Sequence, residues 1–168
     1  TAGLNTVVGS YAFDAATTAS GSVAIGYAAL STVTTAASNT AVGYNSLAAN
    51  TTGDNNVAVG TSTLTANTTG HSNTGLGQGA LVTNTTGTQN TALGRTALGL
   101  ATTADNNVSI GYLSMQATTT GSGNVGIGVI SLTANTTAAN NTAVGYGTLT
   151  ANTTGYSNAA VGVSSGSV

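Results

Sequence analysis

Cysteine, lysine and proline are absent from this chain, and charge of either sign is almost absent. Without cysteine the chain has no disulfide framework and no thiolate metal site. Charged residues make up 2% of the sequence, whereas ordinary soluble domains contain about 25%. No basic patch is available to neutralise phosphates, so we expect no nucleic-acid partner.

Long apolar runs and leader signals are also missing. No stretch approaches the roughly 20 apolar residues that a membrane-spanning helix needs, and none has the regions of a signal peptide, so we expect no membrane insertion. Aliphatic residues nevertheless recur at fixed positions. That regularity separates the chain from disordered sequences, which are poor in aliphatic residues.

Glycine recurs every 17 residues along the chain without a slip. A fixed short period indicates one structural unit stacked on itself, and a catalytic site would usually interrupt the period locally. We therefore expect one repetitive domain over residues 1–168, no enzymatic activity and no cofactor. The periodic glycines are Gly9, Gly26, Gly43, Gly60, Gly77, Gly94, Gly111, Gly128, Gly145 and Gly162.

Other columns of the repeat are equally regular. A small residue and then an aliphatic residue precede most periodic glycines, as Ala58 and Val59 precede Gly60. Leucine or a large apolar substitute stands four residues after the glycine, and asparagine closes most units. A Thr-Thr pair is present without exception in nine units, beginning at Thr17, Thr34, Thr51, Thr68, Thr85, Thr102, Thr119, Thr136 and Thr153.

This repeat predicts an all-β parallel β-solenoid of about ten coils. Valine, isoleucine and threonine favour strands, and no segment keeps a helical apolar period. Seventeen residues suit one coil of two or three short strands, and coils about 4.8 Å apart would form a rod about 48 Å long. We expect the aliphatic residue before each glycine, and the leucine after it, to fill the interior. The glycine itself is expected at a bend with positive φ or at a close backbone approach.

The small apolar content of each coil argues for self-association. Roughly two and a half side chains are buried per coil, against the ordering entropy of seventeen residues, so a lone rod has little margin. Residues two and one before the glycine face opposite ways in a strand. We expect a homotrimer or filament held through small-residue surfaces. The repeat lacks polar capping units at both ends, so we also expect it to be part of a longer fibre.

The segments Ser22-Val23-Ala24-Ile25-Gly26, Asn56 to Gly60 and Asn107 to Gly111 resemble the head-domain repeats of trimeric autotransporter adhesins. The fuller unit from Asn39 to Gly53 is similar to repeats of phage tail-fibre-like proteins. The resemblance covers essentially the whole chain, although the adhesin coils are shorter and lack the Thr-Thr pair. It implies a left-handed parallel β-roll, usually trimeric, that serves as an adhesive or spacer segment of an extracellular fibre on a virion or cell surface.

Exposed aromatic residues are the best candidates for an adhesive surface. Tyr27, Tyr44, Tyr112 and Tyr146 share the column directly after the periodic glycine. Exposed aromatic rings suit both sugars and proteins, so the expected receptor is a cell-surface glycan or protein; the alternative is plain packing along the rod or between chains.

The ionisable residues are too few and too scattered for catalysis or metal binding. Asp54 and Asp105 lie three coils apart in one column, about 14 Å from each other and beyond the spacing of a glycosidase pair, and Asp14 is in another column. His71 shares the column of Asp54 but lacks further ligands for a metal. We expect Arg95 to be a lone solubilising charge.

The sequence leaves two further possibilities open, ice binding and N-glycosylation. The alternative function is ice binding through threonine ladders, which would use Thr51, Thr52, Thr68, Thr69, Thr85, Thr86, Thr136 and Thr137. If the pair is extended, however, only one of its rows faces outward. Asparagines in Asn-x-Thr sequons allow N-glycosylation, although the repeat itself creates this spacing; they are Asn50, Asn67, Asn84, Asn135, Asn140 and Asn152.

Overall fold

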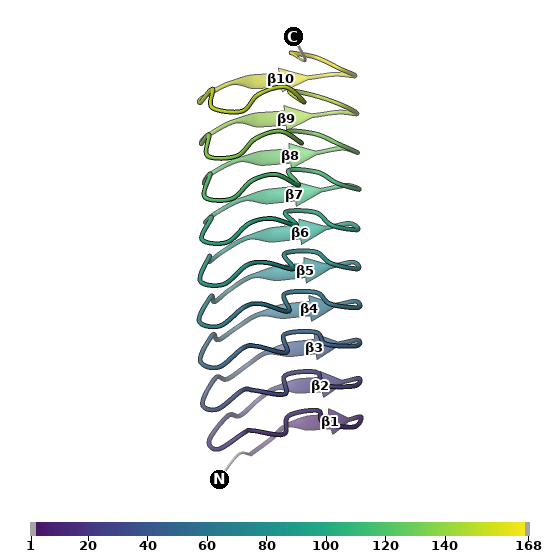
Figure 1. The fold of residues 1–168 in the computed structure, drawn as a ribbon, viewed down its shortest axis with the longest axis vertical. Helices are drawn as coiled ribbons and strands as arrows, with labels where there is room; N and C mark the ends of the chain where they lie inside the picture. The colour runs from purple at the N-terminus through teal and green to yellow at the C-terminus, as the bar shows by residue number, and fades with distance from the viewer. Residues whose placement is uncertain (1–2, 167–168) are drawn as a thin grey trace.

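One three-residue strand forms in each 17-residue turn of a β-solenoid, and the strands stack in chain order as a ten-stranded parallel sheet (Figure 1). The computed structural model describes residues 3–166, and these contain no helix that could cross a membrane. The predicted solenoid is confirmed, with one strand per turn instead of two or three. The strands are β1 (Thr6–Val8), β2 (Val23–Ile25), β3 (Thr40–Val42), β4 (Val57–Val59), β5 (Thr74–Leu76), β6 (Thr91–Leu93), β7 (Val108–Ile110), β8 (Val125–Ile127), β9 (Thr142–Val144) and β10 (Ala159–Val161).

Equivalent residues of successive repeats lie directly above one another. Ala41 of β3 pairs with Ala58 of β4, for example, and the same register of one repeat holds at every strand pair. The ladder continues outside the strands, where the Leu47 N–H donates to the Thr63 carbonyl at 3.0 Å and the Thr51 N–H to the Thr68 carbonyl at 3.0 Å. Hydrogen bonding between turns therefore holds the irregular part of each turn as well as the strand.

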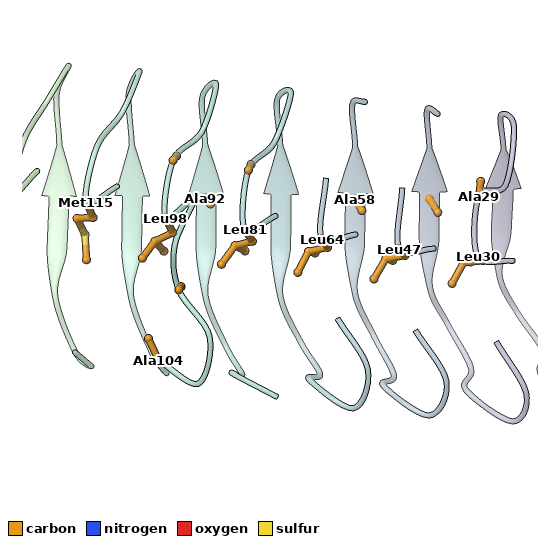
Figure 2. Packing of buried hydrophobic residues seen from close by; sticks show 14 of the residues in the cluster. Ala29, Leu30, Leu47, Ala58, Leu64, Leu81, Ala92, Leu98, Ala104 and Met115 are labelled. Carbon is orange, nitrogen blue, oxygen red and sulfur yellow. The ribbon is translucent and has the colours of Figure 1, made fainter. Parts of the chain in front are cut away.

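The leucine column fills the interior, as predicted. Figure 2 shows Leu30, Leu47, Leu64, Leu81, Leu98 and the substitute Met115 in one row facing the strands. All six and Leu132 are fully buried, whereas Leu149 is 8% exposed and Phe13 is partly buried. The small residues at the middle of the strands, such as Ala41, Ala58 and Ala92, are also fully buried. Each turn thus packs one large side chain from the opposite wall against one small strand residue.

The expectation for the aliphatic residue before each glycine is wrong. These side chains point out of the coil: Leu76 is 44% exposed and Leu93 is 41% exposed. The reason is the thickness of the coil, because a Cβ added at Gly75 in the middle of β5 would lie 2.6 Å from Thr63 Cγ2 and 3.6 Å from Leu64 Cδ1. Only a small residue fits between the walls, so strand alternation turns its larger neighbours outward. The small-residue surfaces expected to join copies lie inside the coil.

The periodic glycine has both a positive φ and a close approach to the backbone of the next turn, as its position in the repeat predicts. Gly77 has φ +127°, and a Cβ added there would lie 2.7 Å from the Gly94 carbonyl oxygen of the next turn. The Gly77 N–H meanwhile donates to the Val59 carbonyl of the preceding turn at 2.9 Å. A side chain at this bend would collide with the backbone of the neighbouring turn.

Left-handed backbone at leucine is a feature that the composition does not reveal. Leu47 has φ 49° and Leu64 has φ 52°, and the residues two positions earlier, Asn45 and Ser62, are also left-handed. This conformation costs a side-chain-bearing residue roughly 1–2 kcal/mol. The stacked hydrogen bonds and the burial of leucine hold it in place in every turn.

Two columns of asparagine form buried amide ladders inside the coil. In the column that closes each unit, the Asn73 N–H and Nδ2 donate to Asn56 Oδ1 at 2.9 and 3.2 Å, and Asn73 Nδ2 also donates to the Gly87 carbonyl at 2.8 Å. In the second column, seven residues after the glycine, Asn67 Nδ2 donates to Asn50 Oδ1 at 2.8 Å. The second ladder is interrupted by Ala101, which leaves Asn84 Oδ1 without a partner. The coil interior therefore contains an amide network beside its hydrocarbon core.

Candidate interaction face

The outward side of the sheet is an exposed face that is largely apolar. We call it the strand face, and it consists of the first and third residues of each strand, such as Val57 and Val59 of β4. Ile25 and Val57 are each 38% exposed. The face runs the length of the sheet because every turn repeats it in the same register.

The strand face carries no charge. None of the strands β1 to β10 contains an ionisable residue. The charged residue that lies closest to a strand in the sequence is Arg95, which follows the periodic glycine after β6. An uncharged, aliphatic and straight surface of this kind suits packing against another apolar surface and offers nothing to a charged ligand.

The tyrosine column borders the strand face where each strand ends. Tyr27 and Tyr44 stack with ring centroids 5.3 Å apart and an interplanar angle of 11°. Tyr11, one residue further along its own turn, meets Tyr27 edge-on at 5.4 Å. The Arg95 guanidinium lies 5.7 Å from the centroid of the Tyr112 ring, whereas Tyr146 is 55% exposed.

The stacking restricts what these predicted adhesive residues can bind. The Tyr27 ring stacks against Tyr44 and also makes an edge-on contact with Tyr11. A ligand therefore cannot stack on the face of Tyr27 that Tyr44 covers. Arg95 likewise contacts the Tyr112 ring. Tyr146, which forms no ring contact with any described residue, is 55% exposed, so the rings of the column differ in how much of their surface is free.

The ionisable residues do not form a site. Asp54 Oδ1 accepts a hydrogen bond from the Ala37 N–H at 2.6 Å, and Asp105 Oδ1 accepts from the Thr88 N–H at 2.6 Å. His71, which we considered beside Asp54, instead places Nδ1 3.4 Å from Ser72 Oγ. Within residues 3–166 no three potential ligands gather for a metal, and no pocket is present. Asp54 and Asp105 brace the turn that precedes their own, and Asp14 is exposed.

The Thr-Thr pair lies at a bend, with unequal roles for its two members. The first threonine is half-buried and its hydroxyl is committed: Thr68 Oγ1 donates to the Thr85 carbonyl at 3.0 Å, and Thr51 Oγ1 donates to the Thr68 carbonyl at 3.1 Å. The second threonine of the pair, such as Thr69, is exposed. One row therefore belongs to the ladder and only the other faces solvent as a continuous row of hydroxyl and methyl groups. The first row contains Thr51, Thr68, Thr85 and Thr136, and the second contains Thr52, Thr69, Thr86 and Thr137.

We expect Thr68→Val to lower the free energy of unfolding by about 1 kcal/mol, because it removes the hydroxyl bond to the Thr85 carbonyl while keeping the shape of the side chain. Urea unfolding followed by circular dichroism measures the change. Thr69→Val is the matched control and should change stability by less than about 0.5 kcal/mol, since its side chain is exposed. Equal losses in the two variants would contradict the unequal roles.

Five of the six predicted sequons lie in the second amide ladder. Asn50, Asn67, Asn84 and Asn135 are fully buried. Asn67 Nδ2, for example, donates to Asn50 Oδ1 and to the Gly70 carbonyl within the coil. Among these six sequon asparagines only Asn140, with φ 59°, is exposed in the folded rod. The repeated Asn-Thr-Thr spacing is thus explained by the ladder and the bend, because the asparagine and the first threonine both bond within the coil.

The strand face itself is the functional candidate that the sequence analysis missed, since the aliphatic column was placed inside. A signal was present in the alternation of small and aliphatic residues, but either column could have been the inner one.

No protein-family model, no curated protein and no solved structure matches this chain.

Proposed function

We propose that this chain is a structural segment of an extracellular fibre, of the kind found on virions or cell surfaces, whose copies associate side by side through the strand face. The observation that carries the proposal is the uninterrupted column of outward-facing aliphatic side chains, each partly or largely exposed, on a regular rod. A globular protein with a single ligand would concentrate its specialised residues in one place. Here the 17-residue period continues without interruption along the rod.

The dimensions of the strand face suit a stable interface. Ten strands at about 4.8 Å spacing and three to four residues of extended chain cover a flat area of roughly 500–650 Å². Specific interfaces bury about 800 Å² of accessible surface per partner, and side-chain relief adds to the flat figure.

A second copy of the same chain is the partner that fits this face best. It repeats with the same axial spacing, so every turn of one copy can meet a turn of the other. The strands carry no charge that would have to be desolvated or would select an oppositely charged partner. The resemblance to adhesin and tail-fibre repeats favours three copies around a common axis, with the tyrosine column as the part that meets neighbouring molecules or a receptor.

The double substitution Leu76→Glu and Leu93→Glu tests the association. Both side chains are more than a third exposed, at 44% and 41%, so the solenoid should fold. Burial of their carboxylates between copies would be costly, and we expect at least a 100-fold weaker association, measured by sedimentation equilibrium. Thr86→Glu with Thr103→Glu is the control, because these exposed residues lie in the same two turns at the bend. A wild-type monomer at micromolar concentration, or an assembled Leu76/Leu93 variant, would overturn the proposal.

Ice binding is the second candidate function, and the exposed row of second threonines supports it. The structure leaves fewer threonine hydroxyls free to bind ice than the sequence suggested, because the hydroxyls of the first row donate to backbone carbonyls. Thermal hysteresis of ice growth decides between the two functions. Activity that is abolished by Thr69→Tyr and retained in the Leu76/Leu93 variant would favour ice binding over the fibre role.

A further inference from the structure

The second amide ladder, in the column seven residues after the periodic glycine, is interrupted at Ala101. Asn50, Asn67 and Asn84 occupy this column in three successive turns before alanine takes the next place. In the intact part of the ladder each later amide nitrogen donates twice. Asn84 Nδ2, for example, donates to Asn67 Oδ1 at 2.8 Å and to the Gly87 carbonyl at 3.0 Å. Ala101 cannot repeat these bonds, because its side chain has no carboxamide group.

Two oxygen atoms converge at this interruption without a shared donor. Asn84 is fully buried, and its Oδ1 accepts no hydrogen bond from the described residues. The Ala104 carbonyl accepts from Asn90 Nδ2 at 2.7 Å, but it lacks the second amide donor that the Gly87 carbonyl receives from Asn84. Asn84 Oδ1 and the Ala104 carbonyl oxygen are the two atoms nearest to a Cβ added at Gly87, so they approach one common region.

The equivalent pair of oxygens one turn earlier shows what satisfies such a site. Asn67 Oδ1 and the Gly87 carbonyl oxygen are the two atoms nearest to a Cβ added at Gly70, and Asn84 Nδ2 lies 3.0 Å from the same point. That nitrogen donates to both oxygens. The group that fits the next turn is therefore a small donor of two hydrogen bonds, at the place of the amide nitrogen.

The backbone around Ala101 keeps the spacing of the other turns. The Thr85 N–H donates to the Thr102 carbonyl at 2.9 Å and the Thr102 N–H to the Thr119 carbonyl at 3.0 Å. The Thr68 N–H donates to the Thr85 carbonyl at the same 2.9 Å in the intact part of the ladder. Because the turns do not close up, alanine in place of asparagine frees a volume of about 30 Å³, the share of one water molecule in the liquid.

We propose that the coil binds one buried water molecule between Asn84 and Ala104, where it takes the place of a carboxamide and completes the ladder. The water donates one hydrogen bond to Asn84 Oδ1 and the other to the Ala104 carbonyl. Neither oxygen carries a formal charge, so neutral water fits the site and a cation would be costly to bury. The site lies inside a single coil and does not depend on association between copies.

Substitution of Ala101 tests the site, because the coil already accepts larger residues in this column. Ala101→Asn supplies the amide donor, and Ala101→Val fills the same space with hydrocarbon, as the fully buried Val33 does in an earlier turn. Oxygen-17 relaxation dispersion of the solvent counts internal waters that exchange slowly with the bulk. We expect the wild-type chain to hold one such water more than either variant. A high-resolution crystal structure should place it within hydrogen-bond distance of Asn84 Oδ1 and the Ala104 carbonyl oxygen.

Asn67→Ala is the converse variant. It should add one slowly exchanging water to the wild-type count, because it leaves Asn50 Oδ1 and the Gly70 carbonyl oxygen without the nitrogen that now donates to both. Equal water counts in the wild type and in Ala101→Asn would overturn the inference. So would a crystal structure without water density between Asn84 and Ala104, or a folded Asn67→Ala variant that gains no water.

Discussion

Replacing Gly77 with alanine should lower the free energy of unfolding by about 3–5 kcal/mol. The new Cβ would lie 2.7 Å from the Gly94 carbonyl oxygen, 2.8 Å from its carbonyl carbon and 3.2 Å from the Arg95 nitrogen. All three atoms are backbone of the next turn, which cannot move without breaking the ladder. The φ of +127° adds strain of about 1–3 kcal/mol for a residue with a side chain. Equilibrium urea unfolding monitored by circular dichroism measures the loss.

Gly79→Ala is the matched control because it lies two residues away in the same turn. A Cβ there meets only Thr96 Cγ2 at 3.4 Å, and its φ of +67° lies in the left-handed region that Ala28 adopts in the same column. We expect a loss of about 1 kcal/mol. If Gly79→Ala proved as damaging as Gly77→Ala, the contact with the neighbouring turn would not be the cause of the glycine period.

Replacing Asn73 with alanine should destabilise the rod by about 2–4 kcal/mol. The substitution removes the Nδ2 bonds to the Gly87 carbonyl and to Asn56 Oδ1. It also removes the acceptor of the Asn90 N–H at 3.0 Å and of Asn90 Nδ2 at 3.1 Å. The Asn90 N–H then has no partner in a buried site, and an unsatisfied buried group costs about 1–3 kcal/mol. Thermal and urea unfolding should agree on the loss.

Serine variants provide an internal scale for the amide ladder. Ser22 occupies the ladder column in an early turn, where its Oγ accepts from the Asn39 N–H at 3.1 Å. Asn73→Ser should therefore retain one of the bonds and lose less stability than Asn73→Ala. Asn55→Ser, at an exposed left-handed position that holds serine in other turns, should be nearly neutral. A neutral Asn73→Ala would show that the ladder contributes little.

These predictions separate two requirements that the repeat satisfies at once. The periodic glycine and the asparagine ladders act inside the coil and decide whether the rod forms. The aliphatic column acts outside, where Leu76 and Leu93 are exposed and contribute little to the interior of a single rod. Substitutions in the first group should weaken folding and association together, whereas substitutions in the aliphatic column should affect association alone.

The sequence by itself determined the period, the parallel stacking and the placement of the leucine column. Each of these follows from spacing: Gly60 and Gly77 are one turn apart, Leu47 and Leu64 must stack if glycines stack, and asparagines in one column can bond along it. The sequence also placed Asp54 and Asp105 three turns apart in one column and Asp14 in another. These inferences need only the repeat length and the geometry of a strand.

Only the tertiary structure decided which of two alternating columns faces the interior. Strand alternation requires Ala58 and Val59 to face opposite sides but does not say which one is inside. The choice depends on the distance to the opposite wall, where Thr63 and Leu64 leave room for no more than a small side chain. The left-handed leucines and the buried sequon amides are settled in the same way. Each is a contact between residues that are neighbours only after the chain has coiled, so no single repeat contains the information.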